Sequence, residues 1–247
     1  MVPKIPPKYR PRGISFLYED RDVIVVSKEA GILTTHTRRH EPFTVENAVG
    51  DYLRKGCARS AKRAFLVHRL DRETSGLLLF AKNEEAQERI KEHWKENEKI
   101  YFALLRGTPS PSQGVLESYL AENEDLYMVT VRDSSQGKFC QTEYEVLEGA
   151  GKVSAVRIRL LTGRKNQIRA QFAHAGHPVL GDEKYGRDSG ERRLYLHAAY
   201  LAFNHPFTGR RLAFESPVPR SFTLRLGRRD MVWPVPSMDV ANGGQKA

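Results

Sequence analysis

The pattern of hydrophobic and polar residues along the chain predicts many short strands and a few helices. Apolar runs of strand length lie at residues 23–26, 77–80, 100–105, 127–131, 139–147, 153–161, 194–203 and 211–214. In one of them Val156, Ile158 and Leu160 alternate with two arginines, which is typical of a strand with one face in water. The last two runs flank a turn sequence at 206–209, so they are expected to form a hairpin.

Three segments have the spacing of helices, at residues 44–56, 83–98 and 166–175. In the second, Asn83 is expected to cap the helix, and Ala86, Ile90 and Trp94 form one apolar stripe. The third segment ends before Gly176, a residue type that favours the end of a helix. Strands of antiparallel type, combined with few helices, predict an α+β fold.

The length and composition are those of a folded protein that needs no metal or disulfide staple. The chain has 247 residues, of which 40% are hydrophobic, and this is enough to bury a core. Cys57 and Cys140 are far apart in sequence, so neither a disulfide framework nor a zinc ribbon is expected. The first residues lack the apolar segment of a signal peptide, and no apolar run is long enough to span a bilayer. These features predict a cytoplasmic protein.

The formal net charge of +10 favours polyanionic partners, although a protein that is merely basic has the same charge. The first twelve residues contain four basic residues, four prolines and no acid. They are expected to form an extended arm that either touches phosphates or is solvated. We therefore expect three parts: a basic, proline-rich arm at 1–13, a folded domain at 14–227 and a flexible tail at 228–247.

Residues 68–83 combine polar groups suited to catalysis with the strand that follows them. Asp71 lies just ahead of a Thr-Ser-Gly sequence that suits a tight turn. Backbone donors in such a turn can hold a carboxylate rigidly, with the strand as support. The alternative is an aspartate that only caps the turn and pairs with Arg69 at the surface.

Other candidate residues lie further along the chain. Tyr101, at the head of a predicted strand, could present a flat face and a hydroxyl to a base, or could simply pack in the core. Arg164 lies near the start of a predicted helix, where a cation calls for an anionic partner. His174 and His177 are three apart but have no third ligand nearby, so a metal site is not expected. The motifs of nucleotide hydrolases, serine hydrolases, dinucleotide-binding proteins and zinc proteases are not found.

Taken together, these segments resemble the RluA-type family of pseudouridine synthases. The family's H-R-L-D-x-x-T-S-G-L-L-L is matched fully by residues 68–79, and its K-x-Y-x-A-L by residues 99–104. Its G-H-P-V-x-G-D-x-x-Y-G and H-P-x-T-G-x-x-L-x-F-x-S-P-x-P segments follow in order, and the resemblance extends from Tyr18 to Pro219. His68 favours this type over the RsuA type, which has glycine there. The departures are Glu29 for proline, and Asn166 and Gln171 for histidine.

The resemblance implies that residues 14–227 form the pseudouridine synthase catalytic fold, a mixed, mainly antiparallel sheet flanked by helices and loops. It implies that Asp71 is the catalytic carboxylate, which either attacks C1′ or takes a proton from C2′. Arg164 would be the cation beside it, and Tyr101 would stack on the uracil, with its hydroxyl a candidate to receive the C5 proton. No cofactor or metal is implied, because the reaction only rearranges the uridine. The residues expected to contact RNA or to flip its base are His68, Arg69, Lys28, Arg38, Arg39, Lys165, Gln167 and Arg169.

The expected partner is a stem-loop of ribosomal or transfer RNA, since bases leave the stack at low cost in loops. One alternative is an RNA-binding factor of the same fold that does not catalyse, against which the presence of Asp71, Tyr101 and Arg164 argues. Another is a nucleoside or glycoside hydrolase, which usually needs a second carboxylate that is not evident near Asp71. A coiled-coil seam is not visible in the sequence, so a monomer is expected.

Overall fold

The structure, a computed structural model, describes residues 11–37, 41, 43–55, 57, 59–186, 190–228, 231 and 233–235. Residues 1–10 of the expected arm and residues 236–247 of the expected tail lie outside this range, as do Arg38 and Arg39. Within the described ranges, no helix is both long and apolar enough to cross a membrane.

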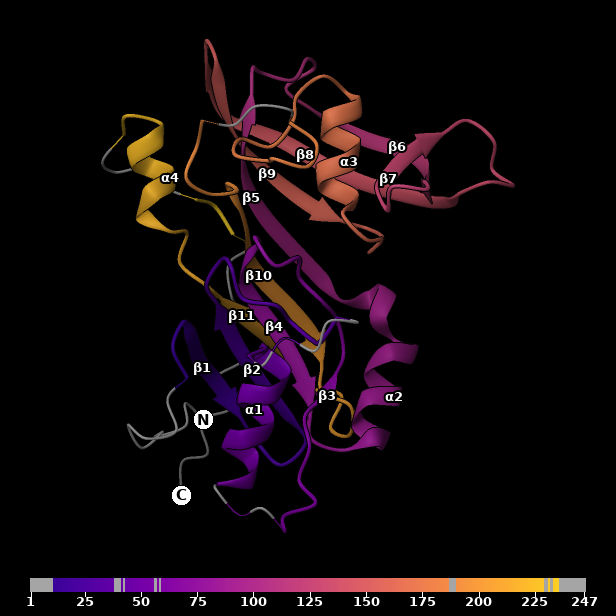
Figure 1. The fold of residues 1–247 in the computed structure, drawn as a ribbon, viewed down its shortest axis with the longest axis vertical. Helices are drawn as coiled ribbons and strands as arrows, with labels where there is room; N and C mark the ends of the chain where they lie inside the picture. Colours follow the sequence, from indigo (N-terminus) through magenta and orange to yellow (C-terminus); the bar gives the residue numbers. More distant parts are fainter. Residues whose placement is uncertain are drawn as a thin grey trace.

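One sheet of eleven strands forms the framework of the described residues (Figure 1). Its strands are β1 Ile14–Glu19, β2 Val23–Lys28, β3 Phe65–Leu66, β4 Ser75–Ala81, β5 Glu98–Arg106, β6 Gln113–Glu122, β7 Met128–Val131, β8 Lys138–Ala150, β9 Val153–Leu160, β10 Leu196–Asn204 and β11 Arg211–Glu215. They lie in the order β1-β2-β4-β10-β5-β9-β8-β6-β7, with β3 beside β4 and β11 beside β10. Every pair is antiparallel except β4 with β10, which confirms the predicted α+β fold and its mixed, mainly antiparallel sheet.

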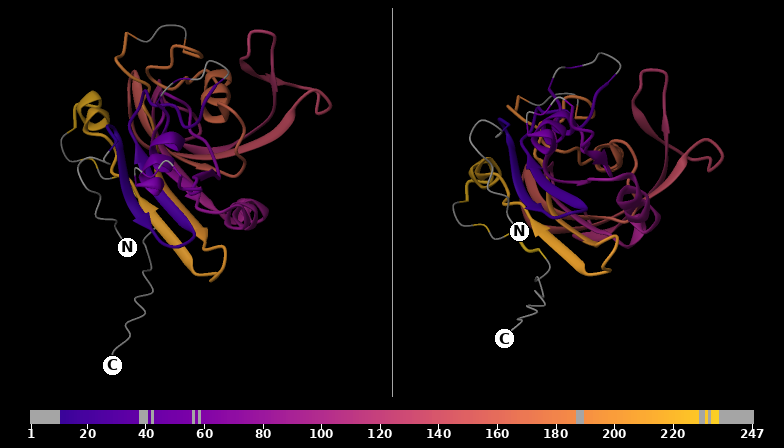
Figure 2. Two further views of the ribbon diagram at one scale, coloured as in Figure 1. Left: turned by 60° about the horizontal axis from the view of Figure 1, so that its bottom comes forward. Right: turned by 90° about the horizontal axis from the view of Figure 1, so that it is seen from below.

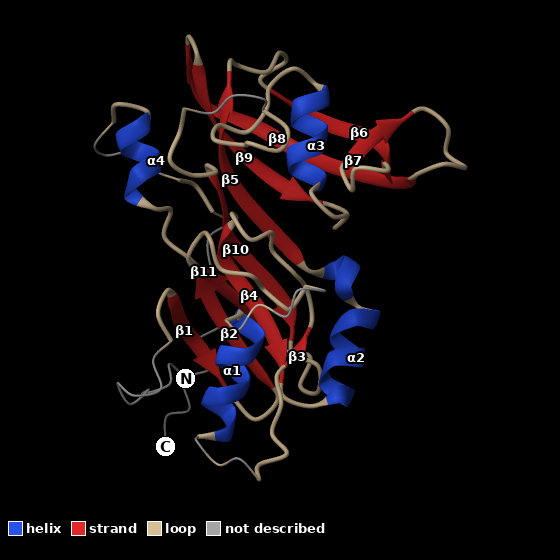
Figure 3. Ribbon diagram, viewed as in Figure 1, coloured by secondary structure: helices blue, strands red, loops and turns tan. Residues whose placement is uncertain are grey.

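The described residues form four α-helices, α1 Val45–Arg54, α2 Glu84–Glu92, α3 Gln167–His174 and α4 Arg220–Arg225 (Figure 3). The sheet curves around α1 and α3 (Figure 2), whose residues Val49 and Phe172 share one core with Phe80 of β4. On the opposite face α2 packs through Ala86 against Leu79 of β4. Neighbouring residues of β4 therefore face different cores, as the two-residue period of a strand requires.

The expected helices are present, with one difference in length. The Asn83 side chain caps α2 by accepting a hydrogen bond from Ala86 N (2.7 Å). This helix ends at Glu92 rather than at 98, because His93 leaves helical geometry and Trp94–Glu96 form a 3₁₀ turn that leads into β5. The expected hairpin of β10 and β11 is confirmed. The apolar pattern does not predict β1, β3, β6 or α4.

The sheet narrows to a short parallel contact where β4 meets β10. Ser75 and Gly76 pair there with His197 and Ala198. Gly76 has a φ of +116°, and a Cβ on it would lie 2.1 Å from the carbonyl oxygen of Ala198, so this close approach requires glycine. Because Asp71 lies four residues before the start of β4, this contact anchors its loop near the middle of the strand order.

The chain past residue 227 still contributes to the core. The Trp233 ring packs edge-on against Phe102, with 5.0 Å between ring centroids, and lies 6.0 Å from the Phe222 ring. Met231 and Val235 are half-buried in the same region. Packing therefore continues beyond the expected end of the folded domain at 227, as far as Val235.

Candidate active site

The loop that carries Asp71 is held on both sides by the segment that follows β2. The Thr34 hydroxyl donates to Leu70 O (2.8 Å) and accepts from Leu70 N (3.2 Å). On the other side of Asp71, the carbonyl oxygen of Arg72 accepts from Gly31 N (2.8 Å). Thr34 and Leu70 are buried, so the two bonds between them are shielded from water. The loop therefore presents Asp71 in one position.

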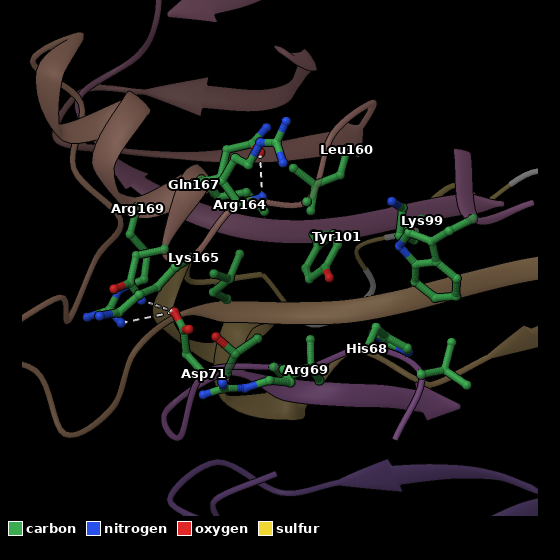
Figure 4. Close-up of a pocket in the computed structure, with 18 of the residues that line it drawn as sticks. His68, Arg69, Asp71, Lys99, Tyr101, Leu160, Arg164, Lys165, Gln167 and Arg169 are labelled. Carbon is green, nitrogen blue, oxygen red and sulfur yellow. Dashed lines mark hydrogen bonds and ion pairs between the residues drawn. The ribbon is translucent and has the colours of Figure 1, made fainter. Parts of the chain in front are cut away.

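The start of α3 supplies two donors to Asp71. Its Oδ2 accepts from Nδ2 of Asn166 (2.5 Å) and from Nη1 of Arg169 (3.1 Å) (Figure 4). Arg169 also donates to both carboxylate oxygens of Asp182, from Nε at 2.8 Å and from Nη2 at 2.7 Å. Among the described residues, none donates a hydrogen bond to Oδ1 of Asp71. One oxygen of Asp71 is thus fixed while the other is free to act.

Arg169 is a buried cation shared by two carboxylates, with 8% of the residue exposed. Burial opposes its charge, but the hydrogen bonds and charge of Asp182, and then those of Asp71, outweigh burial and raise the pKa of Arg169. Asp182 is itself held by the backbone N–H groups of Lys184 and Tyr185 (3.0 Å each). The Tyr185 ring covers the guanidinium at 5.3 Å from its centroid. These contacts aim the guanidinium at Asp71 in one orientation.

A cavity of about 540 Å³ opens beside Asp71 (Figure 4). Tyr101 of β5 lines it together with Leu160 and Leu196, which form an apolar wall. Burial, and then the charge of Asp71, raise the pKa of Tyr101, so its hydroxyl keeps its proton at neutral pH. An apolar wall near one charged group is typical of a site for a small ring or base.

Another part of the cavity is lined by His68, Trp94 and Lys99. The rings of His68 and Trp94 lie 4.9 Å apart at 32°, and Nε2 of His68 accepts from Leu79 N (3.1 Å). Burial, helped by the charge of Lys99, lowers the pKa of His68 to about 3, so the ring is neutral. Burial also lowers the pKa of Lys99, whose ammonium lies 5.4 Å from the Trp94 ring centroid.

Arg164 does not pair with Asp71, contrary to the expectation. Its side chain is exposed, and its Nε donates to the carbonyl oxygen of Phe139 (3.2 Å). The reason lies in where α3 begins: Asn166 has a left-handed backbone, with a φ of 51°, and the helix starts only after it. Arg164 is therefore outside the helix, and Arg169, which was expected to contact RNA, takes the place beside Asp71.

Two other residues expected to contact RNA are buried and bonded within the protein. Gln167 is 2% exposed, and its Nε2 donates to Thr142 Oγ1 (2.8 Å) and Gln141 O (3.1 Å). Lys28 is 1% exposed, and its ammonium donates to the carbonyl oxygen of Arg72 (3.0 Å). Neither side chain is exposed, although Gln167 lines the cavity beside Asp71 and Lys28 lines a second cavity, so their contact with RNA stays a prediction.

Arg69 and Lys165 keep positions suited to RNA contact. Both are exposed, and both lie along the cavity beside Asp71. Lys165 forms an ion pair with Glu122, and an exposed pair of this kind opens at little cost. His68, by contrast, lies inside the cavity wall.

The structure adds Asn166, Asp182 and Tyr185 to the site, which the sequence argument left without a role. The segment G-D-x-x-Y-G contains two of them, so a signal existed. Nothing local, however, indicates that Asp182 meets Arg169. Gln171, the other departure in α3, is buried and accepts from the Thr142 hydroxyl (2.6 Å), so it serves the scaffold.

One group of possible metal ligands lies away from this cavity, formed by Asp20, Asp22 and His205. Nδ1 of His205 accepts from the backbone N–H of Phe207 and of Thr208 (3.3 Å each), so the ring proton is on Nε2. That nitrogen lies 3.2 Å from a carboxylate oxygen of Asp20 and can donate to it. The arrangement is therefore that of a structural hydrogen-bond cluster.

The chain is similar in sequence to enzymes that act on RNA. Residues 22–174 match the family described as RNA pseudouridylate synthase. An uncharacterized RNA pseudouridine synthase of Chlorobaculum parvum is 32% identical in an alignment of 251 positions, which covers 91% of this chain and 76% of that protein. Ribosomal large subunit pseudouridine synthase C of Escherichia coli is 36% identical over 219 residues, which cover 82% of this chain and 66% of that protein.

The fold is also similar to solved structures. Human RNA pseudouridylate synthase domain containing 4 superposes with a TM-score of 0.71 at 25% identity, covering 86% of this chain and 92% of that one. Human RNA pseudouridylate synthase domain containing 1 has a TM-score of 0.64 at 29% identity and covers 83% of each chain. Fold and sequence together define an isomerase that acts on RNA. More specifically, the chain belongs to the RluA-type family of RNA pseudouridine synthases.

Proposed function

We propose that this enzyme isomerises a uridine of a structured RNA with Asp71 as the carboxylate that acts on the ribose. The observation that carries this proposal is a carboxylate with one oxygen held and one free. Asn166 and Arg169 bind Oδ2, while Oδ1 has no hydrogen-bond donor among the described residues. This carboxylate lines a cavity of about 540 Å³. Attack on C1′ and removal of the C2′ proton both require such an oxygen.

The reaction breaks the N1–C1′ bond, turns the uracil, joins C5 to C1′ and releases the C5 proton. As the glycosidic bond breaks, positive charge develops on the ribose. A carboxylate whose orientation is already fixed stabilises that charge without reorganisation. Arg169 and Asn166 provide this fixed orientation, and Asp182 fixes Arg169 in turn.

Tyr101 provides a face on which the uracil stacks while it turns. A base stacked on an aromatic ring gains about 1–3 kcal/mol, and the contact tolerates rotation because it has little directional preference. The raised pKa of Tyr101 keeps its hydroxyl protonated, so in the free enzyme it acts as a hydrogen-bond donor. Transfer of the C5 proton to this hydroxyl would require prior loss of its own proton.

The RNA approaches through the exposed cations around the cavity. The target base must leave its stack to reach Asp71, at a cost of a few kcal/mol. Arg69, exposed and two residues from Asp71, is placed to fill the gap that the base leaves. Arg164 and Lys165 are exposed at the same cavity and serve as phosphate contacts. The net charge of +10 supports such contacts, whose strength falls as salt rises.

We take RNA of the large ribosomal subunit as the first substrate class to test. The Escherichia coli relative is named a ribosomal large subunit pseudouridine synthase and covers 82% of this chain. Transfer RNA is the second class. In both, a loop or bulge is the preferred target because its bases unstack at low cost.

Tritium release from C5-labelled uridine tests the proposal. RNA would be labelled in cells that lack this gene, separated into ribosomal and transfer RNA, and treated with wild type or with Asp71→Asn. We expect release from one fraction with wild type and at least about a thousandfold less with the variant. Equal release by both proteins would remove Asp71 from the chemistry. Release of free uracil would instead indicate a hydrolase, and RNA binding without release would indicate a binding factor.

We further propose that the enzyme acts as a cytoplasmic monomer with one catalytic domain and two terminal extensions. The catalytic domain would comprise residues 14–227, with the packed residues up to Val235 attached to it. Sedimentation velocity at micromolar protein concentration tests the monomer, and a stable dimer would contradict it.

A further inference from the structure

A second cavity, of about 550 Å³, lies behind the catalytic loop, where β2, β4 and β10 begin or end. It is lined by Lys28 and Arg193, by Ser75 and Ser216, and by His197. All of these except Arg193 are buried, and Arg193 is half-buried. The serine and histidine side chains are hydrogen-bonded within the protein, as buried polar groups normally are, so the two cations are the charged groups that this lining presents to a ligand.

Two cations line this cavity without a carboxylate partner. The Lys28 ammonium donates only to the carbonyl oxygens of Glu29 (3.2 Å) and Arg72 (3.0 Å). The Arg193 guanidinium donates from Nε to Leu194 O (3.2 Å) and from Nη1 to the Ser221 hydroxyl (3.4 Å). Within the described part of the chain, neither cation lies within 4.0 Å of a carboxylate oxygen. Lys28 is thus a buried ammonium without a carboxylate partner. The half-buried Arg193 guanidinium is partly compensated by the Phe222 ring, whose centroid lies 5.3 Å away.

A chain of directed hydrogen bonds fixes Arg193 at the cavity. Nε2 of His197 donates to the carbonyl oxygen of Ser216 (3.1 Å), so its Nδ1 accepts from the Ser75 hydroxyl (2.9 Å). The Ser75 oxygen is then free to accept from Nη2 of Arg193 (3.0 Å). Burial lowers the pKa of His197 to about 4, so the ring stays neutral and this direction is kept at neutral pH. The guanidinium is therefore oriented in advance of any ligand.

The remaining charges of the cavity lie at its edge. Glu29, Glu73 and Arg192 line it and are exposed to solvent. Nε of Arg72 lies 3.8 Å from Oε1 of Glu73, and this exposed ion pair holds the Glu73 side chain only weakly. The acids are thus in high dielectric, whereas Lys28 is buried and Arg193 half-buried, so the attraction of these two cations for an anion is less screened.

We propose that this cavity is a binding site for a phosphate-type oxyanion, held by Lys28 and Arg193. The oxyanion is either a free phosphate group or a backbone phosphate of bound RNA. Its charge would compensate both cations, and Ser27 and Ser216, whose hydroxyl oxygens lie 2.8 Å apart, add hydroxyls at the same cavity. The site goes beyond the proposed catalysis, because binding there requires none of the reacting atoms.

Occupation of this site acts on the catalytic loop through one shared atom. The carbonyl oxygen of Arg72, the residue after Asp71, accepts from both Lys28 and Gly31 N (2.8 Å). Burial lowers the pKa of Lys28 to about 7; Glu73 and Asp71 oppose this shift, and Arg193 adds to it. A bound anion favours the charged ammonium, so binding above neutral pH takes up a proton.

Calorimetric titration of the full-length protein with inorganic phosphate tests the site. At about pH 8, above the pKa of about 7 for Lys28, binding is measured in two buffers of different ionisation enthalpy. We expect Lys28→Met and Arg193→Gln each to weaken binding about tenfold or more, since each removes a charged hydrogen bond. Proton uptake should disappear in Lys28→Met. The matched controls Lys138→Met and Arg132→Gln replace exposed cations on the β7 and β8 side and should bind as wild type does.

The two sources of the oxyanion are separated by adding RNA to the Asp71→Asn protein. If RNA displaces phosphate, the ligand is a backbone phosphate; if both bind together, it is a free anion. Failure of wild type to bind phosphate, or equal binding by all four variants, would overturn the proposal. The melting temperature of Lys28→Met in phosphate-free buffer shows whether this variant folds. It should not lie below that of wild type, because the change removes a buried charge that has no carboxylate partner. Since no turnover is measured, failure here leaves the proposed catalysis untouched.

Discussion

Two segments meet at Asp71, and they are held by different kinds of contact. The loop at 68–76 is held through its backbone, by the Thr34 hydroxyl, by the Lys28 ammonium and by the close approach of Gly76 to Ala198. The start of α3 relies instead on charge, with Arg169 clamped between two carboxylates.

The comparison shows that one segment positions the Asp71 carboxylate and the other binds one of its oxygens. Contacts to the loop backbone place the carboxylate without competing for its oxygens, which stay available for ions and substrate. Charged contacts then bind one of those oxygens and leave the other open. Changes in the first segment should therefore alter stability, and changes in the second should alter activity, together with stability where they break a buried ion pair.

The largest expected effect comes from Asp182→Asn, which changes the ion pairs at the start of α3. This change leaves Arg169 buried with a single carboxylate partner, so we expect the free energy of unfolding to fall by about 3–5 kcal/mol. Urea denaturation measures it. Glu145→Gln is the control, because Glu145 forms an exposed pair with Arg157 (2.7 Å) and should cost less than about 1 kcal/mol. Equal losses in the two variants would contradict the buried clamp.

In the loop at 68–76, Gly76→Ala should lower the free energy of unfolding by about 3 kcal/mol or more. The new Cβ would meet the Ala198 carbonyl oxygen at 2.1 Å, with a φ of +116° that alanine rarely adopts. Gly163→Ala serves as the control in the same denaturation experiment, since a Cβ there meets nothing within 4 Å. A loss of stability for Gly163→Ala as large as that for Gly76→Ala would refute the argument.

Asn166→Gly should separate activity from stability. Glycine accepts the φ of 51° but removes the amide that donates to Asp71 (2.5 Å). A hydrogen bond to a charged group is worth about 1.5–3 kcal/mol, so kcat should fall about tenfold or more while the melting temperature stays close to wild type. An unchanged kcat would show that Asn166 does not position Asp71.

The smallest effect is a pH dependence of stability from His68. Its pKa is about 3 in the folded protein, against an ordinary value of 6.5, so between these values only the unfolded state binds the proton. Stability should therefore fall as pH drops through this window. Melting temperatures measured from neutral to acidic pH should decline more steeply for wild type than for His68→Gln. Parallel curves would mean that the ring takes up its proton equally in both states.

The fold class and most strands follow from the sequence because apolar runs and turn residues are local signals. The sequence does not predict β6, because its residues alternate between exposed and half-buried and include few large apolar side chains. It does not predict α4, because six residues are too few for a helical period to show. The end of α2 depends on the backbone of His93, which no hydrophobic pattern records.

The candidate site was predictable in part. Asp71 and Tyr101 both line the cavity, as their motifs suggest. The cation beside Asp71 was wrongly assigned, because the choice between Arg164 and Arg169 depends on where α3 begins. That start depends on a left-handed Asn166, and the orientation of Arg169 depends on Asp182, which is distant in sequence. Contacts of this range are fixed by tertiary structure rather than by spacing.

The most direct test of this account compares Arg169→Lys with Arg164→Lys in single-turnover tritium release. Lysine keeps the charge but cannot bridge Asp71 and Asp182 as the arginine fork does. We predict that Arg169→Lys lowers the rate of the chemical step about a hundredfold or more. Arg164→Lys should leave that rate and the salt dependence of RNA binding unchanged, because an exposed phosphate contact keeps its charge. The reverse result, with the rate lost in Arg164→Lys and kept in Arg169→Lys, would contradict the arrangement described for Asp71.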